Sequence, residues 1–170
     1  MAIAKRCRHF TDKEKTDKLA LIVAPVSGVR AITTDTSTVT DERPAPIRTD
    51  LFLYATILSP TSTVTHTFVS KGGSAAQPGS DSTGTGGSGG GNVAGEARRA
   101  YIHVVQSSGF NPGKAVGGRR VQVNGGGGGV GGGVVLAEGD GVYAWGNEGE
   151  KLEFQNIGDG DVEFLVFDIA

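Results

Sequence analysis

The chain has 170 residues, of which 37% are hydrophobic and 20% charged, and its formal net charge is −2 at pH 7. This length and composition suit one domain with one hydrophobic core. No apolar run reaches the roughly 18 residues that a membrane-spanning helix needs, so no membrane association is expected. The near balance of charges gives no field that favours nucleic acid, and the single cysteine, Cys7, excludes an internal disulfide.

The N-terminal segment is polar and has no apolar stretch, so no secretory signal is expected. We expect a cytoplasmic protein. The nucleus is the alternative location, because Lys5, Arg6 and Arg8 form a small basic cluster. We assign residues 1–18 to an N-terminal segment and residues 19–170 to a single domain.

Short runs rich in β-branched and aromatic residues, separated by glycine and proline turns, predict strands along the whole chain. Thr11 and Glu14 have the spacing of a capping box, which predicts one or two helical turns within 11–18. The pattern is typical of an all-β sandwich or barrel. In chain order the predicted strands are 19–24, 31–36, 51–58, 62–69, 100–106, 119–124, 134–137, 142–145, 151–156 and 163–168.

Glycine accounts for 29 residues and is concentrated in two tracts, at 72–95 and 125–133. Neither tract has enough branched apolar side chains to offset the conformational entropy lost on ordering it. We therefore predict two long, flexible glycine-rich loops within the domain. No helix pattern follows the second tract, so it is not expected to bind a nucleotide phosphate.

Five segments occur in an order that resembles the pirin-like cupins, specifically the C-terminal barrel of these two-barrel proteins. The resemblance covers about residues 9–170 and implies an all-β fold, a single cupin-type β-barrel (double-stranded β-helix, or jelly roll). The segments are DKLALIVAP (17–25), RRAYIHVV (98–105), VQVNG (121–125), LAEGDG (136–141) and EFLVFDI (163–169).

The resemblance also implies where a metal site would lie, as a His-x-His motif followed by a carboxylate and a distant histidine. His66 falls at the first position, but Phe68 stands at the second. Ala137 and Val142 stand where the later element would have proline and histidine. Because the motif is incomplete, we expect no catalytic residue, no metal and no cofactor, and we interpret the chain as a binding or interaction module.

The alternative is a metal-dependent dioxygenase of the quercetin-dioxygenase type that acts on a flat aromatic substrate. If their faces both turned inward, His66 and His103 would provide two ligands for one divalent transition metal such as Fe, Cu or Ni. The third ligand would be a carboxylate, with no diagnostic spacing among the candidates Asp50, Glu138, Asp140, Glu153 and Glu163.

Aromatic and histidine side chains on the predicted strands are candidates to line a ligand cavity for a flat apolar molecule, with core packing as the alternative. The candidates are His66, Phe68, Tyr101, His103, Tyr143 and Trp145. The pairs Arg98–Arg99 and Arg119–Arg120 indicate either a rim for an anionic ligand or protection of edge strands.

In two-barrel relatives each barrel covers one side of the other, so the resemblance implies that a lone barrel leaves this side open. The run 51–58 is apolar at nearly every position, and the run 163–168 has apolar residues on both faces, which fits such a side. We expect a homodimer whose interface includes Leu51, Leu53 and Ile57. A partner protein, such as a separate N-terminal-barrel chain, is the alternative cover.

Overall fold

The computed structural model describes residues 9–26, 44–69, 97–106, 118–125 and 133–169. The glycine tract at 72–95, the interior of the tract at 125–133, the predicted strand 31–36 and the basic N-terminal cluster lie outside the described residues. Within the described part there is no helix long and apolar enough to cross a lipid bilayer.

The described residues form ten strands and one short helix, which confirms the all-β prediction. The elements are α1 (Asp12–Lys15), β1 (Ala20–Pro25), β2 (Ala45–Ile47), β3 (Leu51–Leu58), β4 (Thr63–Thr67), β5 (Arg98–Val104), β6 (Arg120–Gly125), β7 (Val134–Ala137), β8 (Gly141–Gly146), β9 (Lys151–Asn156) and β10 (Val162–Ile169).

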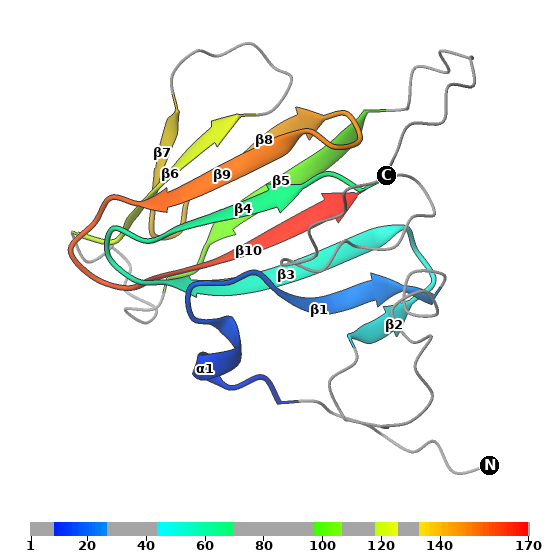
Figure 1. The fold of residues 1–170 in the computed structure, drawn as a ribbon, viewed down its shortest axis with the longest axis horizontal. Helices are drawn as coiled ribbons and strands as arrows, with labels where there is room; N and C mark the ends of the chain where they lie inside the picture. Colours follow the sequence, from blue (N-terminus) through cyan, green and yellow to red (C-terminus); the bar gives the residue numbers. More distant parts are fainter. Residues whose placement is uncertain (1–8, 27–43, 70–96, 107–117, 126–132, 170) are drawn as a thin grey trace, which may run out of the picture.

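The strands form two sheets (Figure 1). The larger has the order β2-β1-β3-β10-β5-β8 and the smaller has the order β4-β9-β6-β7. Neighbouring strands are antiparallel except for β1 and β2, which pair in parallel. The last strand, β10, lies in the middle of the larger sheet between β3 and β5, so strands distant in sequence are joined at its centre.

The hydrophobic core lies between the inner faces of the two sheets. Side chains alternate between the two faces of a strand, and on β10 the fully buried apolar residues are Val162, Phe164 and Val166. Phe164 packs against Phe154 of β9 in the smaller sheet, with ring centroids 5.0 Å apart. The two sheets therefore share one core.

Asn156 holds the turn between β9 and β10 in place from inside the protein. Its side-chain nitrogen donates to the carbonyl oxygens of Leu58, at 2.7 Å, and Gly160, at 2.9 Å. Its side-chain oxygen accepts the backbone N–H of Gly158 at 2.8 Å. The buried amide of Asn156 is thus satisfied by backbone groups, as a buried polar side chain requires.

The structure confirms the short helix and adds one strand that the sequence did not predict. The helix is one turn long, with the Glu14 carboxylate accepting the backbone N–H of Thr11 at 2.7 Å, and the chain leaves it through Asp17, whose φ is 53°. Strand β2 was not predicted, because it is three residues long and contains Pro46. A strand this short carries too few alternating positions to give a period-2 signal.

Candidate functional site

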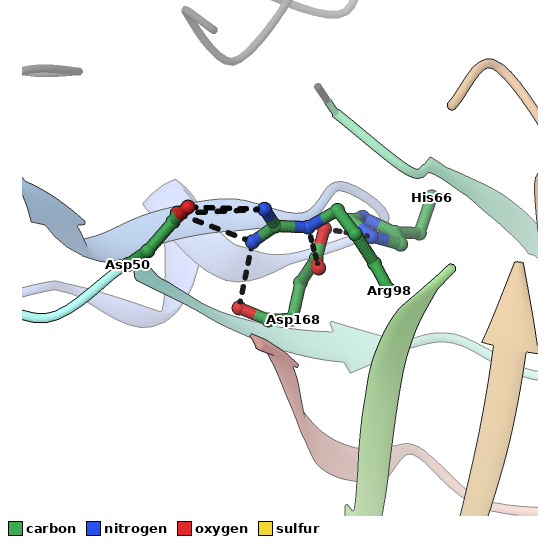
Figure 2. Close-up of polar contacts among 4 residues, drawn as sticks. All are labelled: Asp50, His66, Arg98 and Asp168. Atoms are coloured by element: carbon green, nitrogen blue, oxygen red, sulfur yellow. Dashed lines mark hydrogen bonds and ion pairs between the residues drawn. The ribbon is translucent and has the colours of Figure 1, made fainter. Parts of the chain in front are cut away.

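A cluster of four polar side chains lies at one end of the barrel interior, formed by Asp50, His66, Arg98 and Asp168 (Figure 2). Arg98 is the first residue of β5 and points to the same face as the core residues Ala100 and Ile102. Asp168 lies near the end of the antiparallel neighbour β10, opposite Ala100 in the register. The start of one strand and the end of the other therefore meet at the same edge of the core.

The cluster is linked by short contacts that centre on the Asp168 carboxylate. Arg98 donates from Nε to Oδ1 of Asp168 at 2.6 Å, and Nε2 of His66 lies 3.1 Å from Oδ2. The outer nitrogens of the Arg98 guanidinium reach the Asp50 carboxylate at 3.4 Å. Arg98 thus lies between two carboxylates, and His66 reaches the cluster from β4 of the smaller sheet, as Figure 2 shows.

Three members of the cluster are almost completely shielded from solvent. The exposed fractions are 3% for His66, 3% for Arg98 and 0% for Asp168. Burial of a single charge costs much free energy unless an opposite charge and hydrogen bonds compensate it. The carboxylate of Asp168 and the guanidinium of Arg98 provide this compensation for each other.

The two aspartates and the burial of Arg98 shift its pKa in opposite directions. Burial alone would lower the pKa of Arg98, but hydrogen bonds and charge attraction from Asp168 and Asp50 outweigh it and leave the pKa raised. Arg98 is therefore a permanent cation inside the barrel. Its guanidinium also lies 5.6 Å from the ring centroid of Phe52, within reach of a cation–π contact.

His66 is fixed by aromatic neighbours as well as by Asp168. Its ring meets the ring of Tyr54 edge-on at 5.1 Å and that of Phe68 at 5.5 Å. An ionised carboxylate accepts hydrogen bonds only, so the proton of His66 that faces Asp168 is on Nε2. Burial, together with the negative charge of Asp168, raises the pKa of the Tyr54 hydroxyl, although Arg98 opposes this shift.

The six candidate cavity residues fall on two different faces. His66 and Phe68 point into the core. Tyr101 and His103 alternate with the buried residues of β5 and therefore lie on the opposite, outer face, and in the register Tyr101 faces Tyr143 of β8. Trp145, two residues further along β8, shares that outer face. Ligand binding by these residues stays a prediction.

The arrangement of two histidines across the barrel is not formed. Because His103 is on the outer face of β5, it points away from His66, so the condition of the two-histidine alternative, that both faces turn inward, is not met. His103 instead stacks beside Tyr101, with ring centroids 6.2 Å apart. The alternation of β5 was predicted, but the sequence did not show which of its two sets of side chains faces inward.

Among the five candidate carboxylates, only Asp50 reaches the cluster. Glu138 pairs with Arg119 at 2.9 Å, and Glu163 pairs with Lys15 at 3.0 Å. The other two bond locally, since Asp140 accepts from the Ala137 backbone and Glu153 accepts from the Asn124 amide. Across the ranges that the structure describes, no group of three or more His, Cys, Asp and Glu side chains is arranged to hold a metal ion.

Sequence reasoning missed the roles of Arg98 and Asp168. Arg98 was assigned with Arg99 to a rim or an edge strand, but it is buried on a strand that has a neighbour on each side. A signal was present in the periodicity, because Arg98 is in phase with Ala100 and Ile102 and Asp168 is in phase with Phe164 and Val166. A positive residue on the buried face of one strand and a negative residue on the buried face of another indicate a buried ion pair.

The cluster does not fit a divalent metal ion. Carboxylate and imidazole are suitable ligands in themselves, but Asp168 is already bonded to Arg98 and to His66. A metal ion at these atoms would lie beside the positive guanidinium and would have to displace it. The guanidinium of Arg98 therefore occupies the space beside Asp168 and His66 that a bound metal ion would need.

No known protein-family profile matches the chain, and no curated protein matches it. Among solved structures, YhhW from Escherichia coli is similar, with 18% sequence identity and a TM-score of 0.50 over 96% of this chain and 42% of that chain. This chain therefore spans less than half the length of YhhW.

Two further structures match more weakly. A sugar phosphate isomerase from a cupin superfamily, from Silicibacter pomeroyi, has 10% identity and a TM-score of 0.37 over 71% of this chain and 50% of that one. A predicted oxalate decarboxylase from Thermotoga maritima has 16% identity and a TM-score of 0.32 over 70% and 64%. The strand arrangement and the likeness to YhhW show a cupin-type jelly-roll fold for this chain.

Proposed function

We propose that the chain is a pirin-like single-barrel cupin that acts as a binding or interaction module and not as a metal-dependent enzyme. The observation that carries this proposal is the position of the Arg98 guanidinium. It is buried between Asp50 and Asp168, and Asp168 is also the hydrogen-bonding partner of His66. It supplies positive charge at the place where a catalytic metal ion would otherwise supply it.

The electrostatic cost of adding a metal ion supports this proposal. A divalent ion roughly 5 Å from a guanidinium is repelled by about 7 kcal/mol at an effective dielectric constant of about 20. Displacing Arg98 to relieve the repulsion would leave a buried guanidinium without Asp168, which is also unfavourable. Both routes disfavour loading of His66 and Asp168 with metal.

The pirin-like part of the proposal rests on two of the segments that carry the resemblance. Segments 98–105 and 163–169 largely coincide with β5 and β10, which are neighbours in the larger sheet. They contribute Arg98 and Asp168, the most closely bonded pair of the cluster. The resemblance and the interior ion pair therefore involve the same two strands.

Elemental analysis of the purified full-length chain tests the proposal. After dialysis against a weak chelator, we expect Fe, Cu, Ni, Mn and Zn far below one equivalent, and the same content in a His66→Ala variant. Circular dichroism would confirm that the variant is folded. A stoichiometric metal that is lost in His66→Ala would contradict the proposal. Oxygen consumption with a flavonol in the same preparation would then favour the dioxygenase alternative.

A further inference from the structure

The outward-facing side of the larger sheet carries a row of apolar and aromatic residues across five adjacent strands. We call it the outer sheet face. One row, in which each residue is opposite the next in the register, runs straight across it and contains no charged residue. This row is Val23, Leu53, Phe167, Tyr101 and Tyr143. The rings of Tyr101 and Tyr143 are 4.8 Å apart, and those of Tyr101 and Phe167 are 6.0 Å apart.

Tyr143 is the exposed member of this row, and the other four residues of the row are half-buried. Tyr143 is 59% exposed and Trp145 is 50% exposed, while Ile169 is also exposed. An antiparallel sheet with one face in water normally alternates apolar inward residues with polar outward ones. The outer sheet face departs from this pattern, and contiguous apolar surface of this kind marks an interaction site.

Two charged residues lie toward opposite ends of the outer sheet face. Arg99 on β5 is level with Ile169, at one end of β10, and Glu163 is at the other end of β10. Arg99 is exposed and has no ion-pair partner among the residues that the structure describes. Glu163 is bonded to Lys15, and a carboxylate can accept from a second cation as well.

This distribution of charge is complementary to itself. Consider a two-fold axis midway between two such sheets, parallel to the sheets and perpendicular to their strands. This axis places the Arg99 end of one copy over the Glu163 end of the other. The apolar row then meets the same row of the second copy near the axis. A two-fold interface requires this kind of self-complementarity, and face-to-face sheets pack about 10 Å apart.

The size of the face also suits a dimer. Five strands about 4.8 Å apart and about 20 Å of strand length give roughly 500 Å² in projection. Protruding aromatic side chains raise the accessible area toward the roughly 800 Å² that each partner buries in an interface of standard size. The residues expected at a dimer contact, Leu51, Leu53 and Ile57, lie on this face.

We propose that the outer sheet face binds the same face of a second copy of this chain, with Arg99 paired to Glu163 of the partner subunit. The proposal deepens the interaction role proposed above. It can fail independently of that role, because metal content and molecular mass are separate measurements.

Light scattering coupled to gel filtration, at about 50 µM of the full chain, tests the assembly. We expect twice the monomer mass of 17.4 kDa for the unmodified chain. Tyr143→Glu should return the mass to that of a monomer, because it places a charge in the apolar row. The matched control is Val135→Glu, a comparably exposed position on β7 of the other sheet, which should stay dimeric.

A monomer mass for the unmodified chain would overturn the proposal and leave the face to a different partner. A dimer that survives Tyr143→Glu would equally overturn it, because the contact would then lie elsewhere.

A charge swap tests the predicted pairing. Arg99→Glu alone and Glu163→Arg alone should each weaken the dimer by about tenfold in Kd, because each leaves like charges opposite one another. The double variant should recover most of that loss. Thermal unfolding of each variant below the dimer Kd separates the contact with Lys15 from the interface. A double variant no tighter than the single variants would contradict the pairing.

Discussion

The two faces of the larger sheet use similar residues in opposite ways. On β5, Arg98 points inward and is bonded to Asp168, while its neighbour Arg99 points outward and is exposed. The inner face combines apolar packing with a closed group of charges. The outer face combines apolar side chains with charges that have room for another partner. The comparison shows that position on the strand, and not residue type, determines what each arginine does.

Removing each arginine in turn should give the largest difference in stability between the two faces. Arg98→Ala leaves the fully buried carboxylate of Asp168 without its cation, and we expect the free energy of unfolding to fall by about 3–5 kcal/mol. Arg99→Ala should change it by no more than about 0.5 kcal/mol when measured below the dimer Kd. Urea unfolding followed by circular dichroism measures both. Equal losses would show that the two faces are not distinct.

The effect of the charges in the inner ion pair can be separated from the effect of the volume that the two side chains fill. Replacing both partners, as in Arg98→Met with Asp168→Leu, removes two buried charges together. We expect the double variant to be more stable than Arg98→Ala by about 2 kcal/mol or more, because no unpaired charge remains. A double variant as unstable as Arg98→Ala would mean that shape, and not charge, accounts for the loss.

Substitutions at two glycines of β8 compare the inner and outer faces without changing charge. A Cβ added at Gly146 would collide with the ring of Phe68, which is buried in the core. We expect Gly146→Ala to cost about 1–3 kcal/mol, because a packed ring cannot move without strain. A Cβ at Gly141 would meet the hydroxyl end of Tyr101 on the outer face, and this side chain is only half-buried.

Gly141→Ala should therefore cost less than Gly146→Ala, by at least about 1 kcal/mol. Thermal unfolding at pH 7, below the dimer Kd, compares the two variants directly. If Gly141→Ala were the more damaging change, the outer aromatic row would be more rigid than the core.

Tyr54 gives the smallest effect and one that depends on pH. Its pKa in the folded chain is raised above the ordinary value of 10.0 by burial and by Asp168. The unfolded chain therefore loses the hydroxyl proton first, so the stabilising contribution is complete below about pH 10 and is lost as the pH rises further. The slope of this loss approaches about 1.4 kcal/mol per pH unit.

Tyr54→Phe should remove that slope while leaving the stability near pH 7 within about 1.5 kcal/mol of the original. Urea unfolding between pH 9 and pH 11 checks it. Equal slopes in the two proteins would mean that Tyr54 ionises as readily in the folded chain as in the unfolded one.

The strands were largely predictable because period-2 alternation and glycine or proline turns are local signals. The same signals did not show which face of a strand is inside when both faces are apolar. On β5 the aromatic set containing Tyr101 and His103 is outside, and the smaller set containing Ala100 and Ile102 is inside. That choice depends on the smaller sheet, whose position is set by contacts between distant segments.

The inner polar cluster was only partly predictable for the same reason. His66 was named as a candidate cavity residue, but its partner Asp168 is 102 positions away in sequence. The pairing of β3, β10 and β5 brings Asp50, Arg98 and Asp168 together, and no local pattern contains that pairing. A charged residue in phase with buried apolar residues is the one local sign of such a pair.

The most direct test of the inner cluster is nuclear magnetic resonance of the Arg98 Nε–H and His66 Nε2–H protons. We predict that both exchange slowly with solvent, unlike the Nε–H of Arg99, and that one equivalent of Mn²⁺ leaves their signals unbroadened. This result follows if the guanidinium of Arg98 holds the position beside Asp168. Fast exchange of the Arg98 proton, or its selective broadening together with that of His66 by Mn²⁺, would contradict the account.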